Sequence, residues 1–338
     1  MRIGAVFNSD LTDVHHRVVV PLRELSRRGH EVVYVQPDVS GHVAPERLVG
    51  CDVVHVHRRA EQDVVACADT LLDHGIPVTW DTDDPAAFMP ADGPRFAPAA
   101  NGHRRERELR CELAMLARAS VVTTTSEALA ERCRTFRDHD VVVIEDYLAD
   151  EEYVFQPRAH SGVVIGWVGE PEQRADADWT GLTDSLRRVM ERDCRVRVVT
   201  VGVNLDLDPA RTTHHRHVPF ERLAELIRQF DIGLAPRAEL PASVARSRTT
   251  VKQYAASGVP WVASARAPYL GLGEAEGGLL VSDDGWEHAL LALADARFRR
   301  RQLRRRAEEW GKAQHIAVHA DQWESVFRTA ASAVHQAA

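Results

Sequence analysis

The stretch that decides the fold lies between residues 231 and 264. It reads DIGLAPR at 231–237, a polar loop at 238–245, and RSRTTVKQYAASGVPWVAS at 246–264. The apolar run Ile232–Ala235 predicts a buried strand, Thr249–Ser257 has a helical pattern that stops at a glycine, and Trp261–Ser264 predicts a second strand. A strand, a helix and a strand in this order form a βαβ unit with two parallel strands.

The same alternation extends over the whole chain. Further strands are expected at Ile3–Phe7, Glu31–Gln36, Val53–Val56, Pro77–Trp80, Val121–Thr124, Val141–Glu145, Val163–Val168, Val196–Val201 and Gly278–Val281. Further helices are expected at Val18–Arg28, Asp63–His74, Arg104–Ala119, Gly181–Glu191, Phe220–Gln229, Gly285–Ala296 and Arg299–Trp310. Continuous apolar strands are typical of parallel sheets that are covered on both faces. The sequence therefore predicts two doubly wound, parallel-sheet (Rossmann-like) α/β domains, which we expect to face a cleft.

A polar stretch with Pro and Gly at 156–162 predicts the boundary between these domains. We expect an N-terminal domain over 1–157 and a C-terminal domain over 158–312. A last helical pattern at 313–338 is expected to cross back to the N-terminal domain.

Composition excludes several classes of protein. The 338 residues carry 42 Lys and Arg against 50 Asp and Glu, a formal net charge of −8, which disfavours a nucleic-acid binder. Five scattered cysteines form no Cys-x-x-Cys pair, so neither a disulfide framework nor a zinc site is expected. The sequence shows no apolar run of membrane-spanning length and no signal peptide before the first strand. We expect a cytoplasmic protein without an integral membrane segment. The sequence allows a homo-oligomer but does not specify the oligomeric state.

The motifs point to phosphate binding without a dinucleotide cofactor. Neither Gly-x-Gly-x-x-Gly nor a Walker A loop is present, which disfavours a dehydrogenase. Cations and hydroxyls at 246–250 precede a helix, and a helix N-terminus with cations favours a diphosphate. An ordinary βαβ unit with a solvated, charged loop is the alternative interpretation.

The stretch 231–269 resembles the nucleotide-sugar-binding segment of retaining, two-domain glycosyltransferases of family 4, which have the GT-B fold, and in particular a bacterial subgroup. The matching positions are Arg246-Ser247, Tyr254, Ala256, Gly258, Pro260, Val262, Ser264 and Pro268-Tyr269. Three further segments, 52–58, 121–130 and 166–169, are also similar to that family, so the resemblance covers most of the chain.

This resemblance implies the donor-binding residues. Arg174 and Arg246 would neutralise the diphosphate, and Gln253 would hold the ribose. Gly169 would let the diphosphate approach the backbone closely, and Val218 lies in the segment that would contact the base. Ser247, Thr249 and Thr250 complete the expected donor site at the start of the helix.

Three departures from the family pattern bear on the donor. Ala245 and Gln253 stand where the family has two glutamates separated by seven residues, and Thr250 replaces a lysine. A neutral Gln253 binds a ribose less strongly than a carboxylate would. Lys252 is not an automatic substitute for the missing lysine, since positions 250 and 252 of a helix point about 200° apart. An unusual donor, a rewired site and a loss of activity all stay open.

Polar residues in the expected loop 8–17 after the first strand, and others after the third and fourth strands, form the expected acceptor side. Asp81, Asp83 and His16 are the candidate catalytic groups there, together with Arg174 on the donor side. Asn8, Asp13, His15, Arg17 and Arg58 are expected to bind the acceptor. Asp81 and Asp83 have the spacing of a divalent-metal site and could equally cap a helix, but an acid or hydrogen-bonding role towards the acceptor is favoured. The histidine groups lack the partners of a metal site, so no metal and no cofactor is expected.

The resemblance implies a glycosyltransferase that moves a sugar from a nucleoside diphosphate to an acceptor with retention. The modest length and the lack of a membrane anchor favour a small soluble acceptor, with specialised metabolism as the expected context. The alternatives are a non-catalytic binding protein of the same fold and a nucleotide-sugar hydrolase or epimerase.

Overall fold

The computed structural model describes residues 1–7, 14–38, 41–58, 60–83, 102–137, 140–153 and 161–335. The chain divides into two compact units, each with its own parallel six-stranded sheet. Unit 1 comprises residues 1–146, 244–247 and 319–338, and unit 2 comprises residues 147–243 and 248–318. The predicted fold class, two doubly wound parallel sheets, is confirmed. The predicted boundary at 156–162 falls largely on residues 154–160, which lie outside the described part of the chain.

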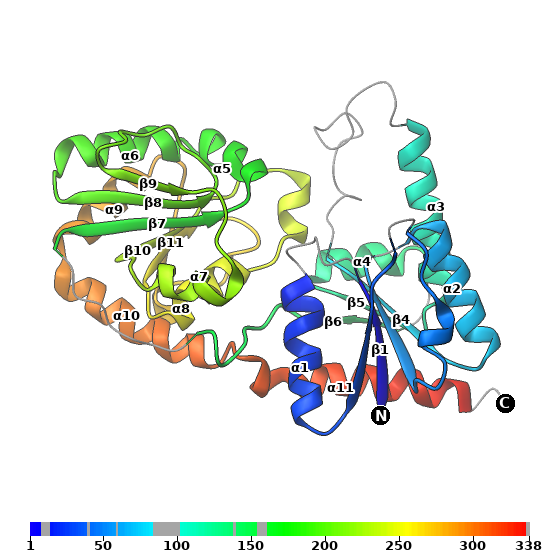
Figure 1. Cartoon of the computed structure of the whole chain (residues 1–338). Helices are drawn as coiled ribbons and strands as arrows, with labels where there is room; N and C mark the ends of the chain where they lie inside the picture. The colour runs from blue at the N-terminus through cyan, green and yellow to red at the C-terminus, as the bar shows by residue number, and fades with distance from the viewer. Residues whose placement is uncertain are drawn as a thin grey trace. The chain divides into compact units, whose positions relative to one another are not determined.

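The sheet of unit 1 has the strand order β2-β1-β3-β4-β5-β6 (Figure 1). Its strands are β1 (Arg2–Val6), β2 (Glu31–Val35), β3 (Val53–His57), β4 (Val78–Thr82), β5 (Val121–Thr124) and β6 (Val141–Val143). Its helices are α1 (Val20–Arg27), α2 (Gln62–Asp73), α3 (Gly102–Arg118), α4 (Glu127–Arg134) and α11 (Ile316–His335). A π-helical turn, His15–Val19, leads directly into α1.

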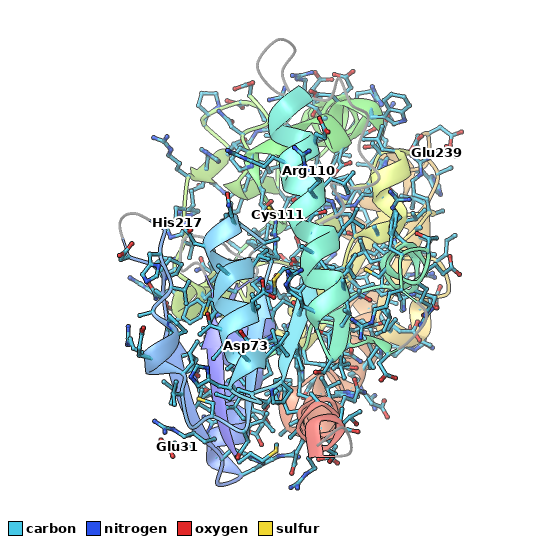
Figure 2. All side chains as sticks on the ribbon, turned by 90° about the vertical axis from the view of Figure 1, so that its right-hand side faces the viewer. Glu31, Asp73, Arg110, Cys111, His217 and Glu239 are labelled. Atoms are coloured by element: carbon cyan, nitrogen blue, oxygen red, sulfur yellow. The ribbon has the colours of Figure 1, made fainter. Side chains whose placement is uncertain are left out.

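The two faces of this sheet differ in chemistry. One face carries an apolar core that includes Val54, Val56 and Trp80. Helices α2 and α3 lie side by side, and Figure 2 shows α3 with Arg110 and Cys111 next to α2. The opposite face carries His55, where the rings of Trp323 and Phe327 from α11 pack edge-on at 5.4 and 5.5 Å. A parallel strand buried on both faces is normally apolar throughout, so this polar face calls for a separate explanation.

The sheet of unit 2 has the order β12-β11-β10-β7-β8-β9. Its strands are β7 (Val163–Gly169), β8 (Val196–Gly202), β9 (Thr212–His215), β10 (Ile232–Ala235), β11 (Trp261–Ser264) and β12 (Gly278–Val281). Its helices are α5 (Arg174–Trp179), α6 (Leu182–Arg192), α7 (Phe220–Ile227), α8 (Thr249–Ala256), α9 (Trp286–Asp295) and α10 (Arg297–Lys312).

Tyr254 on α8 forms hydrogen bonds to the two central strands of this sheet, β7 and β10. The buried hydroxyl of Tyr254 accepts a hydrogen bond from the Val168 backbone nitrogen and donates one to the Leu234 carbonyl, both at 2.9 Å. Gly233 makes room for the ring, because a Cβ there would lie 2.5 Å from Tyr254. The N-terminus of α8 is thereby held at a fixed position relative to β7 and β10.

The predicted strands are confirmed within one or two residues at each end. Strand β9 was not predicted, since its sequence TTHH has no apolar residue. The expectation that His15, His16 and Arg17 lie in a loop was wrong, because these residues belong to the π-helical turn. Among the described helices, none is long and apolar enough to span a membrane.

Candidate functional site

A row of hydrogen-bonded polar residues crosses three strands of unit 1. His57 on β3, Asp81 on β4 and Thr123 on β5 are neighbours in register, which places their side chains on the same face. His57 Nδ1 lies 2.7 Å from Asp81 Oδ2, and Thr123 Oγ1 donates to Asp81 Oδ1 at 2.5 Å. Asp81 is thus the centre of this row.

Arg17, from the π-helical turn, completes the contacts of Asp81. Its Nε and Nη2 donate to the two oxygens of Asp81 at 3.2 and 2.6 Å. Its Nη1 donates to the Ile144 carbonyl at 2.5 Å and to Asp146 at 3.4 Å, and its guanidinium lies 4.8 Å from the centre of the Trp323 ring. The side chains of Arg17 and Asp81 are both 0% exposed. The bidentate geometry is the strong form of this ion pair.

The charges of this network are fixed by the pair. Burial alone would raise the pKa of Asp81, but the Arg17 charge and the His57 hydrogen bond hold that pKa well below its usual range. An ionised carboxylate only accepts hydrogen bonds, so His57 carries its proton on Nδ1. Burial lowers the pKa of His55 to about 4, which keeps this neighbouring ring neutral near pH 7.

Several residues expected to bind the acceptor are enclosed in unit 1. Arg17 and Asp81 contact each other and not solvent. His15 and His16 are 9% and 7% exposed, and their rings pack edge-to-face at 5.1 Å. Asn8 and Asp13 lie outside the described residues. The structure therefore brings Arg17 and Asp81 together as a pair that positions the edge of the sheet.

Arg58 and Asp83 form a second pair at the same edge. Arg58 Nε lies 3.4 Å from Asp83 Oδ1, and the Arg58 backbone nitrogen donates to the Asp81 carbonyl at 2.8 Å. Arg58 has a φ of +53°, a left-handed conformation that is costly for a residue with a Cβ and is often kept at functional sites. The carboxylates of Asp81 and Asp83 are each held by a separate arginine. In the described residues, no group of three His, Cys, Asp or Glu could hold a metal ion.

In unit 2, Gly169 ends β7 and Arg174 begins α5. Arg174 is already engaged: its guanidinium contacts Asp178 at 3.0 Å, Asp206 at 2.9 Å and the Asn204 carbonyl at 2.6 Å. A diphosphate that bound Arg174 would compete with both carboxylates.

The N-terminus of α8 is formed as the sequence predicts. Arg248 is its N-cap residue, no side chain caps the helix, and Thr249 and Thr250 are partly exposed in the first turn. Gln253, the expected ribose partner, is only 4% exposed. Lys252 is buried, with its ammonium 4.5 Å from the centre of the Tyr147 ring.

Arg246 and Ser247 lie in the segment 244–247, which groups with unit 1. Ser126, the N-cap of α4, donates to the Ala245 carbonyl at 3.3 Å in this segment. Arg174 belongs to unit 2, so the two arginines expected to form one clamp are parts of different units. Val218 is partly buried against the core of unit 2.

Two arginines of unit 2 were missed by the sequence reasoning. Arg248 Nε donates to the Pro268 carbonyl at 2.8 Å, and in the described part of the chain its guanidinium meets no carboxylate. Arg237, directly after β10, is buried and donates to Asp176 at 3.0 Å. Their positions after a strand and at a helix N-terminus were the available signals.

No protein-family model and no curated protein matches the chain. Sucrose-phosphate synthase from Thermosynechococcus elongatus matches with a TM-score of 0.68 and 14% identity, over 98% of this chain and 99% of that one. Anabaena HepE in complex with UDP matches with a TM-score of 0.65 and 14% identity, over 96% and 98%. The chain has the GT-B fold.

Other solved structures match with similar coverage. An alpha-glucosyltransferase in complex with UDP and a 13-mer DNA has a TM-score of 0.66 and 12% identity, over 96% of this chain and 99% of that one. A Listeria monocytogenes protein provisionally described as a UDP-N-acetylglucosamine 2-epimerase has a TM-score of 0.57 and 11% identity, over 97% of this chain and 96% of that one. At such identities, the likeness concerns the fold, which is shared by proteins of more than one named activity.

Proposed function

We propose that the chain is a glycosyltransferase that takes its sugar from a nucleoside diphosphate. The observation that carries this proposal is the N-terminus of α8 in a GT-B chain, which no side chain caps and where Arg248 meets no carboxylate among the described residues. Ligands of parallel α/β sheets bind beyond the carboxyl ends of the strands, where such helix termini lie.

The donor's diphosphate would bind at this terminus. Backbone N–H groups of the first turn and the positive end of the helix dipole attract phosphate oxygens. Arg248 adds a full positive charge, and the hydroxyls of Ser247, Thr249 and Thr250 add donors. Gly169, at the end of β7, lets a ligand approach the backbone. Two of the similar GT-B structures contain UDP, so UDP-sugars are the first donors to test.

The chemistry follows from the charge of the leaving group. When the glycosidic bond to the donor breaks, negative charge develops on the diphosphate, and cations and amides that already face it lower the barrier. Arg246 remains a proposed contributor, whereas Arg174 would first have to leave Asp178 and Asp206. Retention of the anomeric configuration is proposed from the family resemblance, and a small soluble acceptor remains part of the proposal.

The acceptor would bind at the carboxyl edge of the sheet in unit 1. Arg58 and Asp83 are two charged groups at this edge, and the buried Arg17–Asp81 pair lies at the ends of β3 and β4. We assign Asp81 a positioning role, because its carboxylate is fully occupied by Arg17, His57 and Thr123.

Thermal denaturation with UDP-, GDP-, dTDP- and ADP-sugars tests the proposal. A ligand that binds only the folded state at 100 times its dissociation constant stabilises it by about 2.7 kcal/mol. We expect one sugar nucleotide to raise the melting temperature, and Arg248→Ala to reduce that rise. Arg328→Ala on α11 is the matched control, since it removes an exposed arginine of unit 1.

Product analysis then separates the alternatives. Release of nucleoside diphosphate that depends on an added acceptor supports the transferase. Release of nucleoside diphosphate without an acceptor would indicate a hydrolase instead. Conversion to an epimeric sugar nucleotide would indicate an epimerase, and binding without turnover would indicate a binding protein.

A further inference from the structure

Helix α10 of unit 2 carries a dense positive charge that the proposed function does not use. Seven of the ten residues 297–306, RFRRRQLRRR, are arginine, and none is acidic. The helix lies on the outside of unit 2 next to α8 (Figure 1). Its inner face is small and apolar: Leu303, Ala307 and Gly311 are buried.

Three of the seven arginines have a role within the fold. Arg300 Nη1 donates to the carbonyls of Leu293 and Ala294 at the end of α9. Arg299 and Arg306 both pair with Glu274, at 2.5 and 3.1 Å. These contacts account for the arginines that flank the buried face.

The other four arginines meet no carboxylate in the part of the chain that the structure describes. They are Arg297, Arg301, Arg304 and Arg305, and all except the partly exposed Arg304 are exposed. At 100° per residue, Arg301 and Arg305 fall within about 60° of Phe298 on the helix surface. Phe298 is 73% exposed. The exposed ring of Phe298 therefore lies among cations that no carboxylate of the described residues pairs with.

This arrangement does not stabilise the fold. Cations in the first turn of a helix oppose its dipole, and α10 has no acidic residue there. Burial lowers the pKa of Arg300, Asp231 opposes this effect, and the charges of Arg304, Arg195 and Arg297 lower the pKa further, which shows repulsion among these arginines. A surface that keeps unfavourable charges together indicates an external anion.

We propose that the outer face of α10, formed by Arg297, Phe298, Arg301, Arg304 and Arg305, docks on the headgroups of an anionic lipid bilayer. The cations complement the phosphates of the headgroups, and the phenylalanine ring inserts at the level of the acyl boundary. A nucleic acid fits less well, because 297–306 carries a single aromatic ring, Phe298, whereas proteins that bind single strands line a charged groove with several aromatic side chains. The surface concerns unit 2 alone and does not depend on the donor or the acceptor.

Sedimentation with lipid vesicles tests this surface on the full chain. We expect binding to vesicles of phosphatidylcholine with phosphatidylglycerol, weakened by salt, and none to phosphatidylcholine alone. Each arginine near the surface contributes about fivefold to the partition coefficient. Arg301→Gln with Arg305→Gln should therefore weaken binding at least about tenfold, and Phe298→Ala should weaken it further.

The matched control is Arg299→Gln with Arg306→Gln, which removes the same charge from the side that pairs with Glu274 and should change binding far less. The proposal is overturned if the wild-type protein does not sediment with anionic vesicles at low salt. It is also overturned if both double variants weaken binding equally, or if a single-stranded or duplex oligonucleotide displaces the protein from vesicles at an equal phosphate concentration. Circular dichroism shows whether each variant is folded, and no sugar nucleotide is needed.

Discussion

Replacing Arg17 by Met tests the buried ion pair of unit 1. The substitution keeps an unbranched apolar chain as far as the position of Nε but removes the charged group, and it leaves Asp81 in a fully buried site with only His57 and Thr123 as partners. Removing one member of a buried pair costs about 3–5 kcal/mol, because the remaining charge is desolvated without compensation. We expect Arg17→Met to lower the stability of unit 1 by this amount at pH 7.

Hydrogen exchange read by mass spectrometry measures this loss unit by unit, so it does not require the whole chain to unfold in one step. Peptides from β1, β3 and β4 should exchange faster in the variant, while peptides from the sheet of unit 2 should not change. The double variant Arg17→Met with Asp81→Leu should be less destabilised than the sum of its single variants. Arg328→Gln, which breaks an exposed pair with Glu324 on α11, is the control and should cost about 0.5 kcal/mol or less.

The pH dependence gives an independent check. Because the folded pKa of Asp81 is depressed, the pair stabilises the protein above the unfolded pKa of about 3.9 and loses this effect as the pH falls below it. The difference between the wild type and Arg17→Met should therefore narrow in acid. A cost near that of Arg328→Gln, or strictly additive single substitutions, would refute the reasoning about this pair.

Three further predictions concern stability and donor binding. Burial lowers the folded pKa of His55 to about 4, so the free energy of unfolding should fall by up to about 3 kcal/mol as the pH drops from 6.5 to 4. His55→Phe should flatten this part of the plot of unfolding free energy against pH, and an unchanged slope in the variant would contradict the prediction. Tyr254→Phe removes the hydrogen bonds of the buried hydroxyl to the Val168 nitrogen and the Leu234 carbonyl and should cost about 1–3 kcal/mol in unit 2, measured by hydrogen exchange at β7 and β10. Arg246→Ala should weaken sugar-nucleotide binding in calorimetry more than Arg58→Ala; equal affinities would disprove the diphosphate position.

Most of the fold follows from the sequence because continuous apolar runs mark the central parallel strands. Strand β9 was not predicted because it lies at the edge of its sheet, pairs on one side only, and has the partly exposed, polar sequence TTHH. The helical conformation before Val18 was predictable from the sequence. Val14 and Val18 are four residues apart and both apolar, and in the structure both are buried on a helical face that includes the turn with Arg17.

The partners within the site could not be predicted in the same way. Arg17 and Asp81 are 64 positions apart, and their contact depends on how the π-helical turn packs over β4. The row of His57, Asp81 and Thr123 depends on the register between strands, which local sequence patterns do not specify. Family resemblance selected Arg246, whereas the structure adds Arg248, two positions further on, as the cation at the helix N-terminus.

The position of the donor is the central claim, and hydrogen exchange of the full chain with and without a sugar nucleotide tests it most directly. We predict that a UDP-sugar, or the donor found by thermal denaturation, slows exchange in peptides that cover the end of β7 at 166–170 and the first turn of α8 at 247–252, and that Arg248→Ala reduces this protection. If every sugar nucleotide leaves these two segments unprotected, or if protection appears only elsewhere in the chain, the C-terminal sheet does not bind the donor as proposed.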